Sequence, residues 1–192
     1  FKYEDVNGDG KIDATDRTFI GNPVPKYTGG LTFNVTVKNL SFETYLYTSI
    51  WNKIFNFSKW FTDFFGSFEG SAKGIRAKDS WTPALGDNAK APIWESHSSV
   101  STNAGENSWY VEDGSYLRVQ YLSIGYALPN TLIKPLGLSR AKLNVAATNL
   151  LTFTKYTGLD PGVGGDVDTN FGVDVGNYPV TRGLTFSLNL GF

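Results

Sequence analysis

The last nine residues, Leu184-Thr-Phe-Ser-Leu-Asn-Leu-Gly-Phe192, alternate large apolar side chains with small or polar ones. A period of two is typical of a β-strand that has one apolar face and one polar face. In a water-soluble sandwich the apolar face would point into a core. In a membrane barrel it would point to lipid, and the polar face would point to the lumen. The stretch therefore predicts an all-β fold and leaves open which environment covers its apolar face.

Four earlier stretches carry the same alternation. They are residues 28–37, 40–50, about 115–128 and 141–151, and Lys38-Asn39 forms a tight turn between the first two. In the third stretch the phase of the alternation slips near Gln120–Leu122, which predicts a bulge. We expect Leu117, Val119 and Tyr121 to point outward before this slip.

Long and short connections alternate along the chain. The long segments are 1–27, 51–113 and 152–179; the hairpin 28–50, the two-strand segment 114–151 and the closing strand 180–192 lie between or after them. Outer-membrane barrels have strands of about 9–11 residues, short periplasmic turns and long extracellular loops. We therefore expect about five C-terminal strands of a large antiparallel transmembrane β-barrel, with the long segments outside the cell. The alternative is a soluble β-sandwich with long loops.

The composition excludes several classes of function. The net charge is -1 with no basic cluster, so we expect no nucleic-acid partner. The chain contains no Cys, and no apolar run approaches the ~18 residues of a transmembrane helix. The single histidine, His97, stands among serines without a Gly-x-Ser-x-Gly motif, so we expect no enzyme. Because the chain lacks Met and opens at Phe1 in a polar motif, we expect part of a longer polypeptide.

The sharpest local motif is an acidic loop near the N-terminus. Positions 1, 3, 5, 7, 9 and 12 of an EF-hand-type loop are occupied by Asp5, Asn7, Asp9, Lys11, Asp13 and Asp16. Oxygen ligands at this spacing bind a hard cation; Lys11 would offer its backbone carbonyl, and Ile12 would anchor the loop in apolar neighbours. Asp16 stands where Glu is usual, and no flanking helices are evident. We expect a structural calcium site; the alternative is a loop of Asx turns without metal.

Aromatic and acidic residues in the long loops supply further candidates. A short helix with one aromatic face, which packs the loop or docks a partner, is predicted by Trp60, Phe61, Phe64, Phe65 and Phe68. Sugar rings could stack on Trp81, Trp94 and Trp109. An interfacial girdle is predicted by Tyr45, Tyr47, Trp51, Phe153 and Tyr156. Either a metal site or a solvated loop would fit Asp160, Asp166, Asp168 and Asp174.

Five stretches, in order, resemble the C-terminal end of SusC/RagA-type TonB-dependent transporters. They are Asp5-Val-Asn-Gly-Asp-Gly-Lys-Ile-Asp13, Asp16-Arg-Thr-Phe-Ile-Gly-Asn-Pro23, Glu112-Asp-Gly-Ser-Tyr-Leu-Arg118, Asn149-Leu-Leu-Thr-Phe-Thr-Lys-Tyr156 with Gly158-Leu-Asp-Pro161, and Tyr178-Pro-Val-Thr-Arg182. The resemblance covers essentially the whole chain. It implies a barrel of about 22 strands with a plugged lumen, of which this chain would supply the last five.

The resemblance also implies a function and partners. It implies TonB-dependent import of nutrient oligomers, glycan or peptide, across the Gram-negative outer membrane. The partners would be the plug and remaining strands of the transporter, a SusD-like lipoprotein over the extracellular mouth, TonB through the missing N-terminal part, and membrane lipid. Glu43 and Lys142, which face the lumen, would tune passage. The rival is a soluble, secreted, calcium-dependent carbohydrate-binding or dockerin-like module, although a dockerin needs a second copy of the acidic loop.

Overall fold

The computed structural model describes residues 1–64, 72–95, 106–163 and 169–192. The chain divides into two compact units, and each is described separately. The sheet unit comprises residues 24–52, 113–162 and 178–192; the loop unit comprises residues 1–23, 53–112 and 163–177. Among the described residues, no helix is long and apolar enough to cross a membrane.

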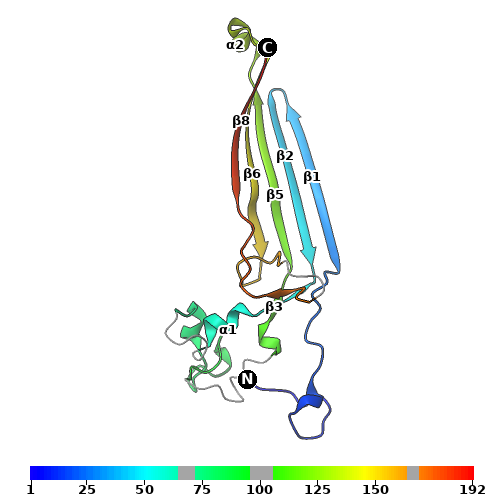
Figure 1. The fold of residues 1–192 in the computed structure, drawn as a ribbon, viewed down its shortest axis with the longest axis vertical. Helices are drawn as coiled ribbons and strands as arrows, with labels where there is room; N and C mark the ends of the chain where they lie inside the picture. The colour runs from blue at the N-terminus through cyan, green and yellow to red at the C-terminus, as the bar shows by residue number, and fades with distance from the viewer. Residues whose placement is uncertain (65–71, 96–105, 164–168) are drawn as a thin grey trace. The chain divides into compact units, whose positions relative to one another are not determined.

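The sheet unit is built on one five-stranded sheet with the order β1-β2-β5-β6-β8 (Figure 1). Its strands are β1 (Tyr27–Val37), β2 (Leu40–Ile50), β5 (Tyr116–Ala127), β6 (Arg140–Thr154) and β8 (Gly183–Gly191). Every neighbouring pair is antiparallel. The all-β fold expected from the alternating stretches is confirmed, and β1 and β8 form the edges of the sheet.

Short connections lie at one end of this sheet. The β1–β2 turn is Lys38-Asn39, with Lys38 at a φ of 52°. Helix α2 (Asn130–Ile133) and a 3₁₀ helix (Lys134–Leu136) connect β5 to β6. Figure 1 shows α2 and the C-terminus at the same end as the β1–β2 turn. The connections from β2 to β5 and from β6 to β8 therefore leave from the opposite end, as the alternation of short and long loops indicates.

A bulge interrupts the pairing of β5 with both of its neighbours. The register shifts between Val119 and Tyr121, so that Gln120 has no partner in either ladder. This confirms the predicted bulge. Tyr121, however, pairs with Tyr45 and Thr148 on the polar face, so its expected outward position is wrong. Toward β2 the extra residue is Gln120, whereas toward β6 the extra residue lies on β6, where Asn149 and Leu150 stand opposite Gln120. On β5 the phase therefore changes before Tyr121 and not after it.

The two faces of the sheet differ in chemistry. Residues that are opposite in register share a face, and the row formed by Ile124, Val145 and Phe186 crosses three strands. The apolar face is open: Phe33, Val145 and Phe186 are 51%, 40% and 72% exposed. In a sandwich these side chains would be buried between two stacked sheets. The structure therefore does not support the soluble-sandwich alternative.

The loop unit contains a smaller, three-stranded sheet with the order β4-β3-β7. Its strands are β3 (Lys53–Asn56), β4 (Val111–Asp113) and β7 (Val173–Asp174), accompanied by helix α1 (Ser58–Asp63) and 3₁₀ helices at Ala14–Asp16, Ile75–Asp79, Gly86–Asn88 and Ser108–Tyr110. Strands of two to four residues are too short to show a period in the sequence. For this reason the sequence did not predict this sheet.

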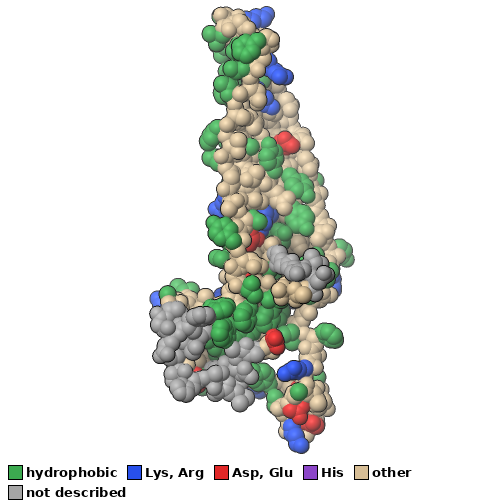
Figure 2. All heavy atoms as spheres, in the orientation of Figure 1, with side chains coloured by type: hydrophobic (Ala, Val, Ile, Leu, Met, Phe, Trp, Pro, Cys, Tyr) green, Lys and Arg blue, Asp and Glu red, His purple; other side chains and the backbone are tan. Residues whose placement is uncertain are grey.

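Helix α1 is shorter than the aromatic stripe predicts. It ends at Asp63, and Phe64 already has an extended backbone. The Trp60 ring stacks on Phe57 with 5.7 Å between centroids, whereas Phe64 is buried against Trp109. Phe65 and Phe68 lie outside the described residues. The described aromatic side chains thus pack against one another within the loop unit, where Figure 2 shows hydrophobic side chains gathered near α1.

Candidate functional site

The acidic loop near the N-terminus is held in shape by its own carboxylates. Asp5 accepts hydrogen bonds from the backbone N–H of Gly8 (2.6 Å) and of Gly10 (2.7 Å). Both glycines have a positive φ, 77° and 81°, which favours glycine. The Asp16 carboxylate accepts from the backbone N–H of Asp13 (2.8 Å). Figure 2 shows acidic and basic side chains gathered at this loop.

The apolar residue of this loop does not anchor it. Ile12 is 54% exposed, so the expectation that it packs on apolar neighbours is wrong. In the described chain around the loop, the one helical element is the 3₁₀ helix Ala14–Asp16. A single turn offers no apolar surface on which Ile12 could pack. Polar hydrogen bonds, rather than a core, therefore hold the loop.

The donor chemistry of the loop suits a hard cation. Its side chains offer oxygen ligands, and in the described residues no Lys or Arg forms an ion pair with Asp5, Asp9, Asp13 or Asp16. Within that part of the chain, however, no three acidic or histidine side chains gather into a metal-ligand group. What the structure shows directly is a loop of Asx turns, such as the hydrogen bond from the Lys11 N–H to Asp9 (2.8 Å).

The turn at residues 13–16 is expected to be sensitive to acid. Hydrogen bonds from the Thr15 backbone N–H and then from its hydroxyl lower the pKa of the Asp13 carboxyl below its ordinary value of 3.8. Because the folded pKa lies below the unfolded one, the carboxylate stabilises the turn fully above the unfolded value. This contribution is lost as the pH falls through the folded pKa. An NMR titration of Asp13 should have its midpoint below 3.8, and Thr15→Ala should raise that midpoint; an unshifted midpoint would contradict the assignment.

The polar face of the large sheet carries the charged side chains. Glu43 lies on it opposite Ser123, and Lys142 lies on it opposite Asn189, as the alternation predicts. Ser123 donates a hydrogen bond across the strands to Asn144 Oδ1 (2.9 Å). This face is therefore polar along several strands.

Two tyrosines expected in the interfacial girdle also lie on the polar face. Tyr45 pairs in register with Tyr121, and Tyr47 pairs with Arg118. Their place in a girdle on the apolar face is therefore wrong, because they have the opposite phase to Leu46. A third girdle candidate, Tyr156, is buried.

Other aromatic side chains lie exposed at the long-loop end of the apolar face. Trp51 and Phe153 are exposed, as the girdle requires. Tyr27, which the sequence analysis did not include, packs edge-on against Trp51 with 5.3 Å between ring centroids. The Lys26 ammonium lies 5.5 Å from the centroid of the Trp51 ring. The exposed aromatic group is thus smaller than expected: Trp51 and Phe153 remain from the predicted girdle, and Tyr27 joins them.

A buried ion pair connects the polar face to the long loop 152–179. Arg118 is only 4% exposed, and its guanidinium contacts Asp160 Oδ1 and donates to Thr152 Oγ1 (3.0 Å). Asp160 also accepts from the backbone N–H of Gly162 (2.7 Å) and of Val180 (3.0 Å). One carboxylate thus holds both the beginning and the end of this loop. No local pattern in the sequence predicts this pairing, because 42 residues separate the partners.

In the described chain, the acidic residues of the long loop 152–179 do not form a metal site. Asp160 forms an ion pair with Arg118. Asp174 accepts hydrogen bonds from the backbone N–H of Gly176 (2.8 Å) and of Asn177. Asp166, Asp168 and the lone His97 lie outside the described residues. The two described carboxylates therefore act as hydrogen-bond acceptors that shape turns.

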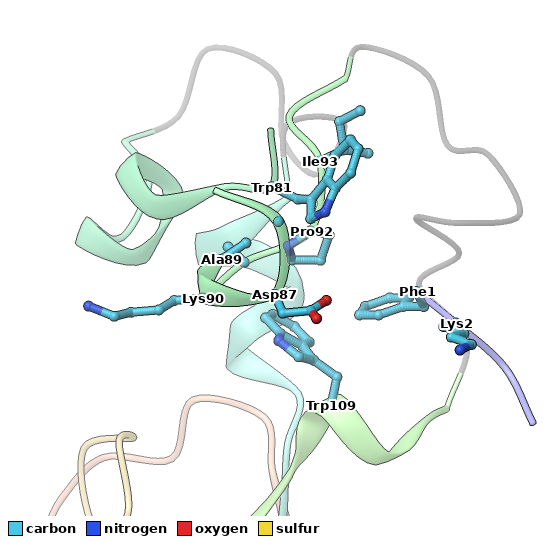
Figure 3. Close-up of a pocket in the computed structure, with 11 residues that line it drawn as sticks. Phe1, Lys2, Trp81, Asp87, Ala89, Lys90, Pro92, Ile93 and Trp109 are labelled. Atoms are coloured by element: carbon cyan, nitrogen blue, oxygen red, sulfur yellow. The ribbon is translucent and has the colours of Figure 1, made fainter. Parts of the chain in front are cut away.

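A cavity of about 540 Å³ lies within the loop unit (Figure 3). Trp81 and Trp109 both line it, whereas Trp94 does not. Trp109 is fixed by Lys59, whose ammonium donates to its carbonyl oxygen (2.8 Å), lies 4.6 Å from its ring centroid and pairs with Glu112 (2.8 Å). Two of the three tryptophans predicted to stack on a ligand are thus brought to one place.

Next to Trp109, Tyr110 is fully buried among aromatic rings. Burial, and then the neighbouring Tyr3 and Asp63, raise the pKa of its hydroxyl. In the described structure this hydroxyl has no hydrogen-bond partner. Tyr110 therefore acts as a neutral packing group beneath the cavity wall.

Comparison with known proteins gives a consistent result. No protein-family model matches the chain. It is 34% identical to TonB-dependent receptor P3 of Formosa agariphila, over 99% of the chain and 19% of the relative. It is 26% identical to TonB-dependent receptor SusC of Bacteroides thetaiotaomicron, over 98% of the chain and 17% of the relative. The chain thus spans about a fifth of the length of these relatives.

Solved structures agree with the sequence comparison. The chain superposes on the structure of the RagAB peptide transporter with a TM-score of 0.75 at 25% identity, covering 95% of the chain and 19% of that protein. It also superposes on the RagAB peptide importer in its open-open state, with a TM-score of 0.73 at 27% identity, covering 95% and 19%. These relatives are receptors and transporters. Over essentially its whole length, the chain therefore matches the C-terminal barrel segment of large TonB-dependent transporters of the SusC/RagA type.

Proposed function

We propose that this chain serves in TonB-dependent import of nutrient oligomers, glycan or peptide, across the Gram-negative outer membrane. The observation that carries the proposal is the open apolar face of the five-stranded sheet, in a chain that matches TonB-dependent receptors along its whole length. Large exposed apolar faces need a partner or a lipid environment. In this reading the apolar face meets lipid and the polar face, with Glu43 and Lys142, meets the lumen.

The loop pattern supports an orientation and a set of partners. The long segments 1–27, 51–113 and 152–179 would be extracellular, and the β1–β2 and β5–β6 connections would be periplasmic. A SusD-like lipoprotein would cover the extracellular mouth, as the match to SusC suggests. The plug and the remaining strands would come from other parts of the transporter, through which TonB would act.

Uptake by intact cells tests this proposal. Cells that carry the full-length transporter should accumulate a labelled oligosaccharide or oligopeptide, and accumulation should stop when TonB is removed or the proton-motive force is collapsed. A panel of glycans and peptides decides between the two proposed substrate classes, of which the peptide class is the one that a matched solved structure transports. Uptake that is indifferent to TonB, or release of the protein from membranes by carbonate without detergent, would overturn the proposal.

The acidic loop is proposed to bind calcium as a structural ion. Oxygen donors from Asp5, Asn7, Asp9, Asp13 and Asp16 and the carbonyl of Lys11 would hold the cation. A bound divalent cation would neutralise carboxylates that have no cationic partner among the described residues. The support is the ligand spacing together with the Asx turns that already orient the loop.

Calorimetry checks the calcium proposal. We expect calcium to bind with a Kd of about 10⁻⁴–10⁻³ M, the range of extracellular modules, and to protect the loop from proteolysis. Asp9→Asn keeps an acceptor for the Lys11 N–H while removing a charged ligand, so it should weaken binding severalfold. Glu43→Gln, an acid outside the loop, is the matched control. If the loop is cut by protease at the same rate in chelator and in calcium, the result would favour the alternative, a loop of Asx turns that binds no metal.

A further inference from the structure

The walls of the loop-unit cavity are held in place by short-range hydrogen bonds. Trp81 donates its backbone N–H to the Ala91 carbonyl (3.0 Å), and Lys90 donates its backbone N–H to the Asp79 carbonyl (2.9 Å). These bonds close the segment 79–91 into a loop that carries Asp87 in the 3₁₀ helix Gly86–Asn88. The opposite wall is Trp109, which the buried Lys59–Glu112 pair holds. The walls of the cavity are therefore held in place by the protein's own hydrogen bonds and ion pair.

Two aromatic rings of the cavity lie on either side of one carboxylate. Figure 3 shows the Asp87 carboxylate between Trp109 and Phe1, with Trp81 on the other side of the segment. The Asp87 side chain makes no hydrogen bond or ion pair with any described residue, and it is exposed to solvent. An unpaired carboxylate between two aromatic rings, in a cavity that a third ring also lines, is an attractive environment for a cation.

The two lysines that line the cavity do not neutralise Asp87. The Lys90 ammonium pairs with Asp79 (3.2 Å), and Figure 3 shows this side chain directed away from the cavity. Lys2 lies on the far side of the Phe1 ring. Neither lysine therefore forms an ion pair with Asp87 in the described structure, although the lining includes both signs.

These features distinguish among ligand classes. Hydrogen-bond donors are present in the lining as the indole N–H groups of Trp81 and Trp109, so the feature that favours a cation over a neutral sugar is the unpaired negative charge of Asp87. Ammonium and guanidinium groups only donate, and they are attracted to the faces of Trp and Phe. We propose that this cavity binds a protonated amine or guanidinium group. Such a group occurs on lysine or arginine side chains of a peptide and on amino sugars, and the volume of about 540 Å³ accommodates either.

Calorimetry on the purified full-length transporter tests the proposal without requiring transport. The probes are blocked Gly-Lys-Gly and Gly-Arg-Gly peptides and a glucosamine trimer. Their neutral counterparts are the Nε-acetyl-lysine peptide and the N-acetylglucosamine trimer. We expect at least one amine or guanidinium probe to bind, with an affinity that falls as salt is added, and its neutral counterpart to bind at least ~10-fold more weakly. Comparison of the peptide and sugar probes identifies the source of the cation.

Three variants locate the binding. Asp87→Asn and Trp81→Ala should each weaken binding of the cationic probe by ~10-fold or more, because they remove the charge and one ring. Trp94→Ala removes a tryptophan that does not line the cavity, and it should leave binding unchanged. Equal binding of charged and neutral probes, or unchanged binding by Asp87→Asn, would overturn the inference. Since these are binding constants, their outcome is independent of whether the transporter imports the same compounds.

Discussion

Arg118→Met is expected to destabilise the sheet unit by about 3–5 kcal/mol, the usual effect of removing one partner from a buried ion pair. Arg118 and Asp160 are both largely removed from solvent, so the substitution leaves a carboxylate without its cation. Among the described residues, Asp160 would then keep only the backbone N–H groups of Gly162 and Val180. We therefore expect the long loop 152–179 to detach from the sheet.

Two measurements check this expectation. Denaturant unfolding of the detergent-solubilised protein should show the lower stability, and limited proteolysis should cut more rapidly between Tyr156 and Thr181. Asp160→Asn, which keeps an acceptor but loses the charge, should have a smaller effect. Arg140→Met is the matched control, because Arg140 is exposed at the opposite end of the sheet. Unchanged unfolding and unchanged proteolysis of Arg118→Met would show that the ion pair does not hold the loop.

Phe186→Arg is expected to cost about 2–4 kcal/mol if the apolar face meets hydrocarbon, the range for arginine on the lipid face of a barrel near the bilayer midplane. Phe186 lies near the middle of β8, is 72% exposed and pairs with Val145. In water the same substitution would replace an exposed phenyl ring with a soluble side chain and would be close to neutral. The size of the change in the free energy of unfolding therefore shows whether this face contacts lipid or water.

A neighbouring residue supplies the control for Phe186→Arg. Thr185 precedes Phe186 on β8, pairs with Ala146 and lies on the polar face. Thr185→Arg should therefore be tolerated much better than Phe186→Arg. Folding yield and denaturant stability in lipid vesicles measure both variants. Equal effects of the two substitutions would contradict the assignment of the faces.

The strands and their faces could be predicted because the signal is local. An alternation such as that of Leu184, Phe186 and Leu188 repeats every two residues, so a few positions fix the strand and both of its faces. The approximate position of the bulge followed from the same pattern. The pattern did not fix the slipped residue, and the predicted place of Tyr121 was wrong for this reason.

The candidate site was less accessible to prediction. The oxygen ligands of the acidic loop are contiguous in sequence, so their spacing could be read directly, and the exposure of Ile12 could not. The stripe of Trp60, Phe61 and Phe64 has helical spacing, yet packing of Phe64 against Trp109 takes it out of the helix. Aromatic packing between distant segments outweighed the local period.

Period and turn chemistry thus settled the strands, their two faces and the order of short and long loops. Only the tertiary structure pairs Arg118 with Asp160. It also brings Trp81, Asp87 and Trp109 to the lining of one cavity. Residues close in sequence are constrained by backbone geometry, which is the same in every protein. Residues far apart meet only where a particular fold closes the loops between them, and no repeat in the sequence records that meeting.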